Sequence, residues 1–112
     1  MPDFTDIPEK NEIIAQGEEG EYFYIIAQGE VEVYKRVATG EKVQLRVLES
    51  GDHFGEIALL KDIPRTASVR TLTPCTFITF SREEFMEMIK KNSYLRESLE
   101  KEAVFLLSDA KD

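Results

Sequence analysis

From residue 12 to residue 80 the chain consists of short apolar runs, each of which is bounded by a glycine or proline turn. Some runs are continuous and rich in aromatic and β-branched residues, as in buried strands, and others alternate apolar and polar residues, which indicates one buried face. The strands expected from these runs are residues 12–15, 22–27, 30–35, 43–48, 67–72 and 75–80. So many short strands separated by tight turns predict an antiparallel sandwich or jelly-roll barrel.

After residue 80 the apolar pattern changes to the period of a helix. Ser81 is a good N-cap, and Glu84 three residues later completes a capping box. Apolar residues recur at helical spacing over 85–89, and a polar break follows at 92–93. A second helix is expected from residue 94 or 95, with fraying over its last residues. The fold class predicted is therefore mainly β with two C-terminal helices.

The length of 112 residues permits a single domain with one modest core. The first residues of the chain are polar and include two prolines, so an irregular lead-in is expected there. The expected organisation is a lead-in over 1–11, a barrel over 12–80 and helices over 81–112, all within one domain 1–112.

Most of the candidate chemistry lies in residues 54–69. Gly55 stands before a short apolar run, 57–60, that is long enough for one or two helical turns, and it allows backbone amides there to point outward toward an anion. Arg65 adds a planar set of donors that stays charged at neutral pH. Glu56 supplies an acceptor in the same short loop. This combination suits a small phosphate-bearing ligand that also has a hydroxyl group.

The same stretch resembles the phosphate-binding cassette of cyclic nucleotide-binding domains. The resemblance rests on Phe54-Gly55-Glu56-x-Ala58-Leu59, on Pro64-Arg65-Thr66-Ala67-x-Val69, and on an upstream pattern of Gly17, Gly20, Phe23-Tyr24-Ile25-Ile26, Gly29 and Gly51-Asp52. It extends over about residues 13–85 and is closest to the regulatory subunits of cyclic-nucleotide-dependent protein kinases. It implies an antiparallel β jelly-roll barrel with a short helix in the cassette, cassette residues 54–69, and a cyclic nucleotide as ligand.

The resemblance also implies a role for each cassette residue. Arg65 is expected to grip the cyclic phosphate, a charge-assisted contact of about 1.5–3 kcal/mol. Glu56 is expected to accept a hydrogen bond from the ribose 2′-hydroxyl; alternatively it only caps the short helix, where the helix dipole favours an acid. The other residues expected at the ligand, as backbone donors or simply as small residues that leave room, are Gly55, Ile57, Ala58, Thr66 and Ala67.

Thr66 is the residue expected to influence the choice of base. In the family that the chain resembles, a hydroxyl at this place can reach the guanine amino group, whereas alanine accompanies a preference for adenine. Threonine therefore admits cGMP, although channels of the family with threonine here still respond to cAMP. The identity of the base is therefore left open, with cAMP favoured because it is the commoner ligand in the family.

Two further residues are candidates for support of the site. The resemblance implies that Glu32, on the strand 30–35, pairs with the cassette arginine and orients it; the alternative is an exposed strand glutamate. Phe105, followed by Leu106 and Leu107, is the candidate for an apolar lid over the base, but an apolar stripe at helical spacing also suits a core helix.

Charge and composition exclude several classes of function. The net charge of −8 argues against direct nucleic-acid binding, because the phosphates would be repelled overall. No apolar run approaches the length of a membrane span, so no membrane insertion is expected. No leader is visible and the single cysteine, Cys75, reads as a small strand residue, which favours a cytoplasmic location.

The function expected is that of an allosteric module that binds cAMP or cGMP and regulates an effector outside this chain, such as a kinase, a channel or a transcription regulator. The chain is then expected to be a fragment of a longer protein, with no catalytic residues, cofactor or metal. Two alternatives stay open. One is a degenerate scaffold that binds no nucleotide. The other is a cupin-like metal enzyme, which needs several histidines where the chain has only His53.

Overall fold

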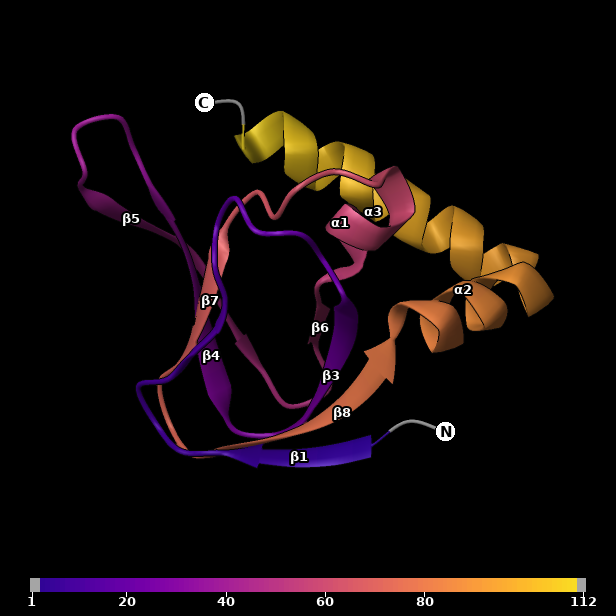
Figure 1. Cartoon of the computed structure of the whole chain (residues 1–112), viewed down its shortest axis with the longest axis horizontal. Coiled ribbons are helices and arrows are strands. Elements are labelled where there is room, and N and C mark those ends of the chain that lie inside the picture. The colour runs from indigo at the N-terminus through magenta and orange to yellow at the C-terminus, as the bar shows by residue number, and fades with distance from the viewer. Residues whose placement is uncertain (1–2, 111–112) are drawn as a thin grey trace.

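The computed structural model describes the backbone of residues 3–110 and the side chains of residues 3–102. The strands are β1 (Asp3–Ile7), β2 (Glu12–Ile14), β3 (Tyr22–Gln28), β4 (Glu30–Arg36), β5 (Lys42–Glu49), β6 (His53–Phe54), β7 (Ser68–Thr71) and β8 (Cys75–Ser81). They form two four-stranded antiparallel sheets in the orders β1-β8-β3-β6 and β2-β7-β4-β5, which face each other across the barrel in Figure 1. The predicted jelly-roll architecture is confirmed.

The N-terminal segment differs from its expectation, because residues 3–7 form a strand rather than an irregular lead-in. β1 pairs with β8 from Asp3 opposite Thr79 to Ile7 opposite Cys75. The segment has little apolar pattern, and Phe4 is 74% exposed. Its pairing satisfies the backbone groups along the free edge of β8, which is a requirement of the fold that side-chain periodicity does not reveal.

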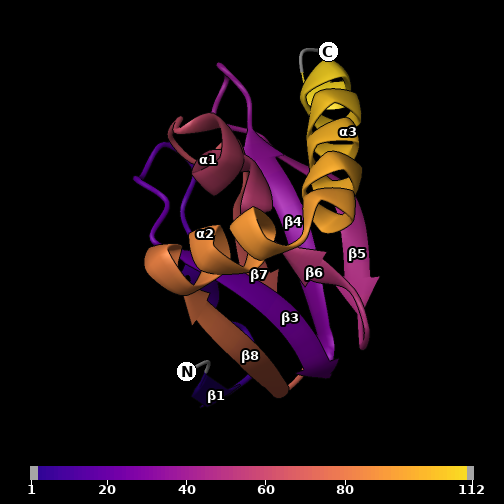
Figure 2. The ribbon, with the colours of Figure 1, turned by 90° about the vertical axis from the view of Figure 1, so that its right-hand side faces the viewer.

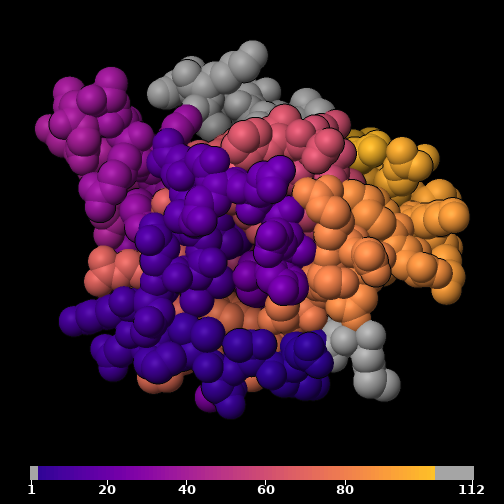
Figure 3. Space-filling model, in the orientation of Figure 1, coloured from indigo at the N-terminus to yellow at the C-terminus, as the bar shows by residue number. Residues whose placement is uncertain are grey.

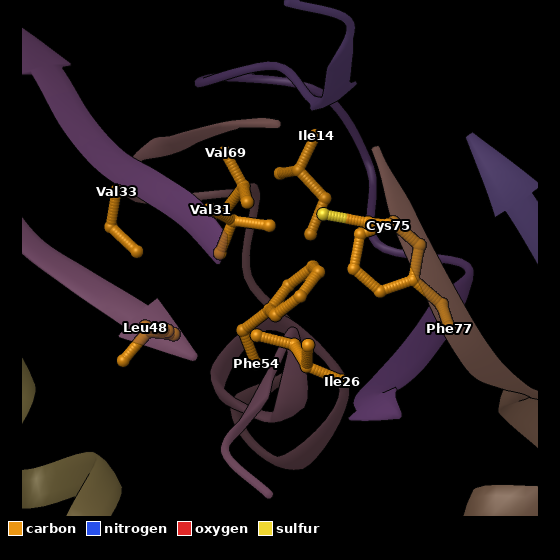
Figure 4. Close-up of a cluster of buried hydrophobic side chains, with 9 residues drawn as sticks. All are labelled: Ile14, Ile26, Val31, Val33, Leu48, Phe54, Val69, Cys75 and Phe77. Atoms are coloured by element: carbon orange, nitrogen blue, oxygen red, sulfur yellow. The ribbon is translucent and has the colours of Figure 1, made fainter. Parts of the chain in front are cut away.

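The main core lies between the two sheets (Figure 4). Its buried residues are Ile14, Ile26, Val31, Val33, Leu48, Phe54, Val69, Cys75 and Phe77. The ring of Phe54 stacks on that of Tyr24 at 4.9 Å and meets Phe77 edge-on at 5.6 Å. Aromatic pairs in these geometries stabilise beyond simple burial. The residue at the start of the cassette is therefore fixed in the centre of the core.

Three helices, α1 (Glu56–Lys61), α2 (Arg82–Lys91) and α3 (Ser93–Ala110), gather at one side of the barrel, with α1 next to α3 (Figures 1 and 2). The predicted capping box starts α2: the Ser81 hydroxyl accepts from the Glu84 amide at 3.1 Å, and the Glu84 carboxylate accepts from the Ser81 amide at 2.9 Å. A second apolar cluster joins the helices to β3 through Phe23, Leu59, Phe85, Ile89 and Leu99. The cassette helix therefore shares one core with both C-terminal helices.

The β4–β5 hairpin, which projects at the upper left of Figure 3, departs from the alternation expected for residues 43–48. Val43, Leu45 and Val47 are each more than 40% exposed. Leu48 and Arg46 lie opposite the core residues Val31 and Val33 instead, and the register of the two strands shifts beyond them, between Val33 and Tyr34. Among the residues that the structure describes, no helix combines the length and the apolarity needed to cross a bilayer.

Candidate functional site

A small pocket opens where the cassette meets the inner face of the β2-β7-β4-β5 sheet. Six of the seven residues that the sequence placed at the ligand line it, namely Gly55, Ile57, Ala58, Arg65, Thr66 and Ala67. Its cavity volume is about 60 Å³, whereas sites for small organic ligands typically measure roughly 300–1,000 Å³. A ligand of nucleotide size would therefore have to move the walls apart or extend into solvent.

Arg65 is held at the wall of this pocket by the backbone. One terminal nitrogen, Nη1, donates to the carbonyl of Gly55 at 2.8 Å, and the other, Nη2, donates to the carbonyl of Tyr22 at 2.8 Å. Burial lowers the pKa of Arg65 from its ordinary value, while Tyr24 acts in the opposite direction. Arginine still remains charged, because its ordinary pKa lies far above neutrality. These two bonds use two of the five N–H groups of the guanidinium and leave three for an anion.

Two glycines leave the space that the guanidinium fills. Gly55 has a φ of +96°, and a Cβ there would lie 2.9 Å from the Tyr22 carbonyl oxygen and 3.2 Å from Nη1 of Arg65. A Cβ on Gly20 would lie 2.7 Å from the Cβ of Ala58 and 3.2 Å from Cζ of Arg65. The upstream glycine pattern therefore has a physical role at the site: the loop around Gly20 packs directly on the cassette arginine.

Arg65 also borders a second, acidic hollow of about 230 Å³, whose lining includes Glu18, Glu19 and Glu21. Three carboxylates would repel a phosphate there. The pocket on the cassette side is lined instead by Arg46 as a second cation, by small residues and by apolar core residues. Electrostatics therefore favour the cassette side as the position for an anion.

Glu56 is the predicted residue that the structure does not bring to this pocket. Its side chain is 2% exposed, and Oε1 lies 3.9 Å from Nε2 of His53. Because Glu56 is the first residue of α1, its side chain projects toward β6 and toward Glu102 of α3. Burial raises the pKa of Glu56, while its own backbone N–H and His53 act in the opposite direction. In this structure Glu56 and Arg65 do not face one common cavity.

Glu32 also has a different partner from the expected one. Its carboxylate accepts from Nζ of Lys42 at 2.8 Å and from the side-chain amide of Gln44 at 3.2 Å. The hydrogen bond from Lys42 lowers the pKa of Glu32, against an opposing effect of burial. Arg65 is held by backbone carbonyls instead, so the expected pair between Glu32 and Arg65 is not formed. The cause is local: Glu32 lies between the core residues Val31 and Val33, so its side chain projects from the other face of β4, where Lys42 is its partner.

Arg46 is a pocket residue that the sequence interpretation missed. It lies on β5 directly opposite Val33, which lines the same pocket. Between Leu45 and Val47 it reads as the polar position of an alternating strand, whereas in the structure Arg46 and Leu48 are the residues of β5 that lie opposite the core residues Val33 and Val31. A basic residue on a strand otherwise rich in valine and leucine was the one available signal.

The lid candidates cannot be placed at the pocket. The backbone of Phe105, Leu106 and Leu107 belongs to α3, but their side chains lie outside the described residues. Thr66, the candidate for base choice, is half-buried and does line the pocket.

The sequence matches known proteins over a region that includes the cassette. Residues 5–92 match the family model described as the cyclic nucleotide-binding domain. A cAMP-dependent protein kinase regulatory subunit from Schizosaccharomyces pombe is 37% identical over 111 residues, which cover 86% of this chain and 27% of the subunit. The cGMP-dependent protein kinase, isozyme 1, of Drosophila melanogaster is 38% identical over 88 residues, covering 76% of this chain and 12% of the kinase.

A solved structure agrees with these sequence relatives. The regulatory domain of Toxoplasma gondii PKA, in a co-crystal with cAMP, superposes with a TM-score of 0.80 at 25% identity, covering 90% of this chain and 39% of that one. This chain spans well under half the length of each of these three proteins. The fold, the cassette and the match over residues 5–92 agree, and the chain belongs to the cyclic nucleotide-binding domain family.

Proposed function

We propose that this chain binds a cyclic nucleotide, cAMP in preference to cGMP, with the cyclic phosphate at Arg65. The observation on which the proposal rests is the guanidinium itself: it is fixed by the carbonyls of Gly55 and Tyr22, and Arg65 lines a pocket that small residues help to form. A prepositioned guanidinium loses little freedom on binding an anion, so its charge-assisted bonds are effective. The relatives named for cAMP and cGMP support the same class of ligand.

The charge distribution favours recognition of the phosphate by a few positioned side chains rather than by a broad positive surface. The chain as a whole is acidic, with a net charge of −8, so no broad positive field attracts a phosphate. Arg65 and Arg46 are the two cations that line the pocket. A single phosphate can be neutralised by these two side chains, whereas a polyanion such as nucleic acid would meet the surrounding negative charge.

Binding is proposed to change the position of α1 and then of the C-terminal helices. The pocket is narrow and Glu56 is turned toward α3, so a nucleotide that contacts both Arg65 and Glu56 requires the first turn of α1 to move. Leu59 of α1 packs in one cluster with Phe85 of α2 and Leu99 of α3. The helices therefore have a direct mechanical connection to the cassette, as a two-state module requires.

The output is proposed to lie in an effector outside this chain: a kinase, a channel or a transcription regulator. The module itself is proposed to have no catalytic activity, to need no cofactor apart from the nucleotide, and to work in the cytoplasm. One alternative is favoured by a specific observation. A narrow pocket with Glu56 turned away also suits a scaffold of the same family that binds no nucleotide.

Calorimetric titration of the 112-residue chain with cAMP and with cGMP separates these two functions. We expect one nucleotide per chain and a loss of at least about tenfold in affinity for Arg65→Ala, from the ~1.5–3 kcal/mol of a charge-assisted phosphate contact. Arg96→Ala is the matched control, because Arg96 lies on α3, away from the pocket lining, and forms an exposed ion pair with Glu100 of the same helix. The absence of heat with either nucleotide at millimolar concentration would favour the scaffold.

A further inference from the structure

Three potential metal ligands meet outside the pocket, where β6, α1 and α3 come together (Figures 1 and 2). His53 lies on β6, Glu56 is the first residue of α1, and Glu102 lies on α3. Nε2 of His53 lies 3.9 Å from Oε1 of Glu56 and 3.3 Å from Oε2 of Glu102. One ligand atom from each residue fits within a span of 4.8 Å. Glu102 thus meets two residues that precede it by 46 and 49 positions in the sequence.

Two buried atoms of this cluster, Oε2 of Glu56 and Nε2 of His53, have no hydrogen-bond partner in the described part of the chain. The side chain of Glu56 is 2% exposed, and its Oε2 accepts no hydrogen bond there. Nε2 of His53 is also buried, and its contact with Glu102 lacks hydrogen-bond alignment. A buried carboxylate oxygen without a hydrogen-bond donor is costly, and native structures contain few such atoms. Glu56 therefore directs an unpartnered oxygen into this cluster.

We propose that His53, Glu56 and Glu102 bind a divalent transition-metal ion of the Zn²⁺ class, with a solvent molecule as the fourth ligand. One imidazole nitrogen and two carboxylate oxygens are a ligand set that Zn²⁺ accepts, whereas Ca²⁺ and Mg²⁺ require oxygen ligands. The two carboxylates balance the charge of the ion. His53 and Glu102 are 30% and 38% exposed at their side chains, which leaves an entry path from solvent.

The distances fit this ion once the ligand atoms, which now span up to 4.8 Å, have drawn together. Ligand atoms at ~2.0–2.2 Å from a tetrahedral Zn²⁺ lie roughly 3.3–3.6 Å apart. The contact between His53 and Glu102 already has this length, and the contact between His53 and Glu56 exceeds it by a few tenths of an ångström. Arg46 also acts electrostatically on Glu56, but it forms no ion pair with it among the described side chains. The ion would fasten α3 to the first residue of the cassette helix.

The test is a titration of the tag-free 112-residue chain with ZnCl₂ by calorimetry, in the absence of nucleotide. We expect one Zn²⁺ per chain, no heat from Mg²⁺ or Ca²⁺, and visible absorption of tetrahedral Co²⁺ in the same site. His53→Ala and Glu102→Gln should each weaken Zn²⁺ binding more than tenfold, since each removes one of three protein ligands. Glu97→Gln, which removes one exposed charge from the same helix, is the matched control and should bind as the wild type does.

A second readout guards against misfolded variants. Zn²⁺ should raise the melting temperature of the wild type and of Glu97→Gln, and should leave that of Glu102→Gln unchanged. Circular dichroism of the metal-free proteins checks that the variants are folded. The proposal is overturned if the wild type binds no Zn²⁺, or if His53→Ala and Glu102→Gln bind it as tightly as the wild type. Because no nucleotide is present, this result is independent of the proposed nucleotide function.

Discussion

Replacing Arg65 by alanine should lower the free energy of unfolding of the protein without nucleotide, and should lower it by a larger amount when nucleotide is present. Without nucleotide, the substitution removes both donors from the carbonyls of Gly55 and Tyr22. A buried acceptor left without its donor costs about 1–3 kcal/mol. Water can enter the space of the missing side chain and restore part of this. We therefore expect the free energy of unfolding to fall by about 2 kcal/mol in total.

With saturating cAMP, the loss should be larger. Each ligand that binds only the folded state adds stability according to its affinity, so a weaker ligand adds less. Loss of the phosphate contact is expected to remove a further ~1.5–3 kcal/mol of binding free energy. The two roles of Arg65 therefore appear as two separate differences, one measured without ligand and one that only the ligand reveals.

The assay is urea unfolding of the wild type, Arg65→Ala and Arg96→Ala, each with and without cAMP at a fixed concentration. A loss of equal size in both conditions would refute the phosphate role and leave Arg65 as a structural residue. Unchanged stability of Arg65→Ala without cAMP would refute the role of the two carbonyl bonds. Arg96→Ala should lose less than about 0.5 kcal/mol in either condition, because its ion pair is exposed.

Thr66→Ala should lower the cGMP-to-cAMP affinity ratio by about 2- to 13-fold, the value of one neutral hydrogen bond, in parallel calorimetric titrations; an unchanged ratio would exclude Thr66 from base choice. Gly55→Ala should destabilise the protein in urea by at least about 1 kcal/mol more than Gly40→Ala, since both glycines have positive φ but only Gly55 is crowded, and equal losses would contradict this. Glu32→Gln should cost about 1 kcal/mol at pH 7, because Lys42 holds the folded pKa of Glu32 below its ordinary 4.5. That contribution is present above pH 4.5 and is lost as the pH falls through the lower folded pKa, so the difference between Glu32→Gln and the wild type should disappear in acid; a constant difference would refute the pairing.

Features encoded by local patterns could be predicted from the sequence. The strand runs and their turns gave the jelly roll, and Ser81 with Glu84 gave the start of α2. The cassette positions from Gly55 to Ala67 converge on one pocket because they belong to one short loop around one short helix. Sequence proximity and spatial proximity coincide in that loop, which is why the interpretation succeeds there.

Features that depend on pairing between distant segments could not be predicted. β1 forms because β8 has a free edge, and the composition of residues 3–7 does not show this. Arg46 reaches the pocket because β5 pairs with β4 so that Arg46 lies opposite Val33, and that hairpin also supplies Lys42 to Glu32. Glu102 approaches Glu56 only after α3 has docked beside α1. Each of these outcomes is decided by tertiary packing rather than by local propensity.

The length of α3 allows it to act as a lever. The helix has 18 residues and so extends for about 27 Å, with Leu99 as a fulcrum in the apolar cluster. The arm from Leu99 to Ala110 is then about 16 Å long, and a tilt of roughly 15° at the fulcrum moves its tip by about 4 Å. A tilt of α3 that leaves the barrel unchanged therefore moves the end of the helix far enough to alter its contacts with another protein surface.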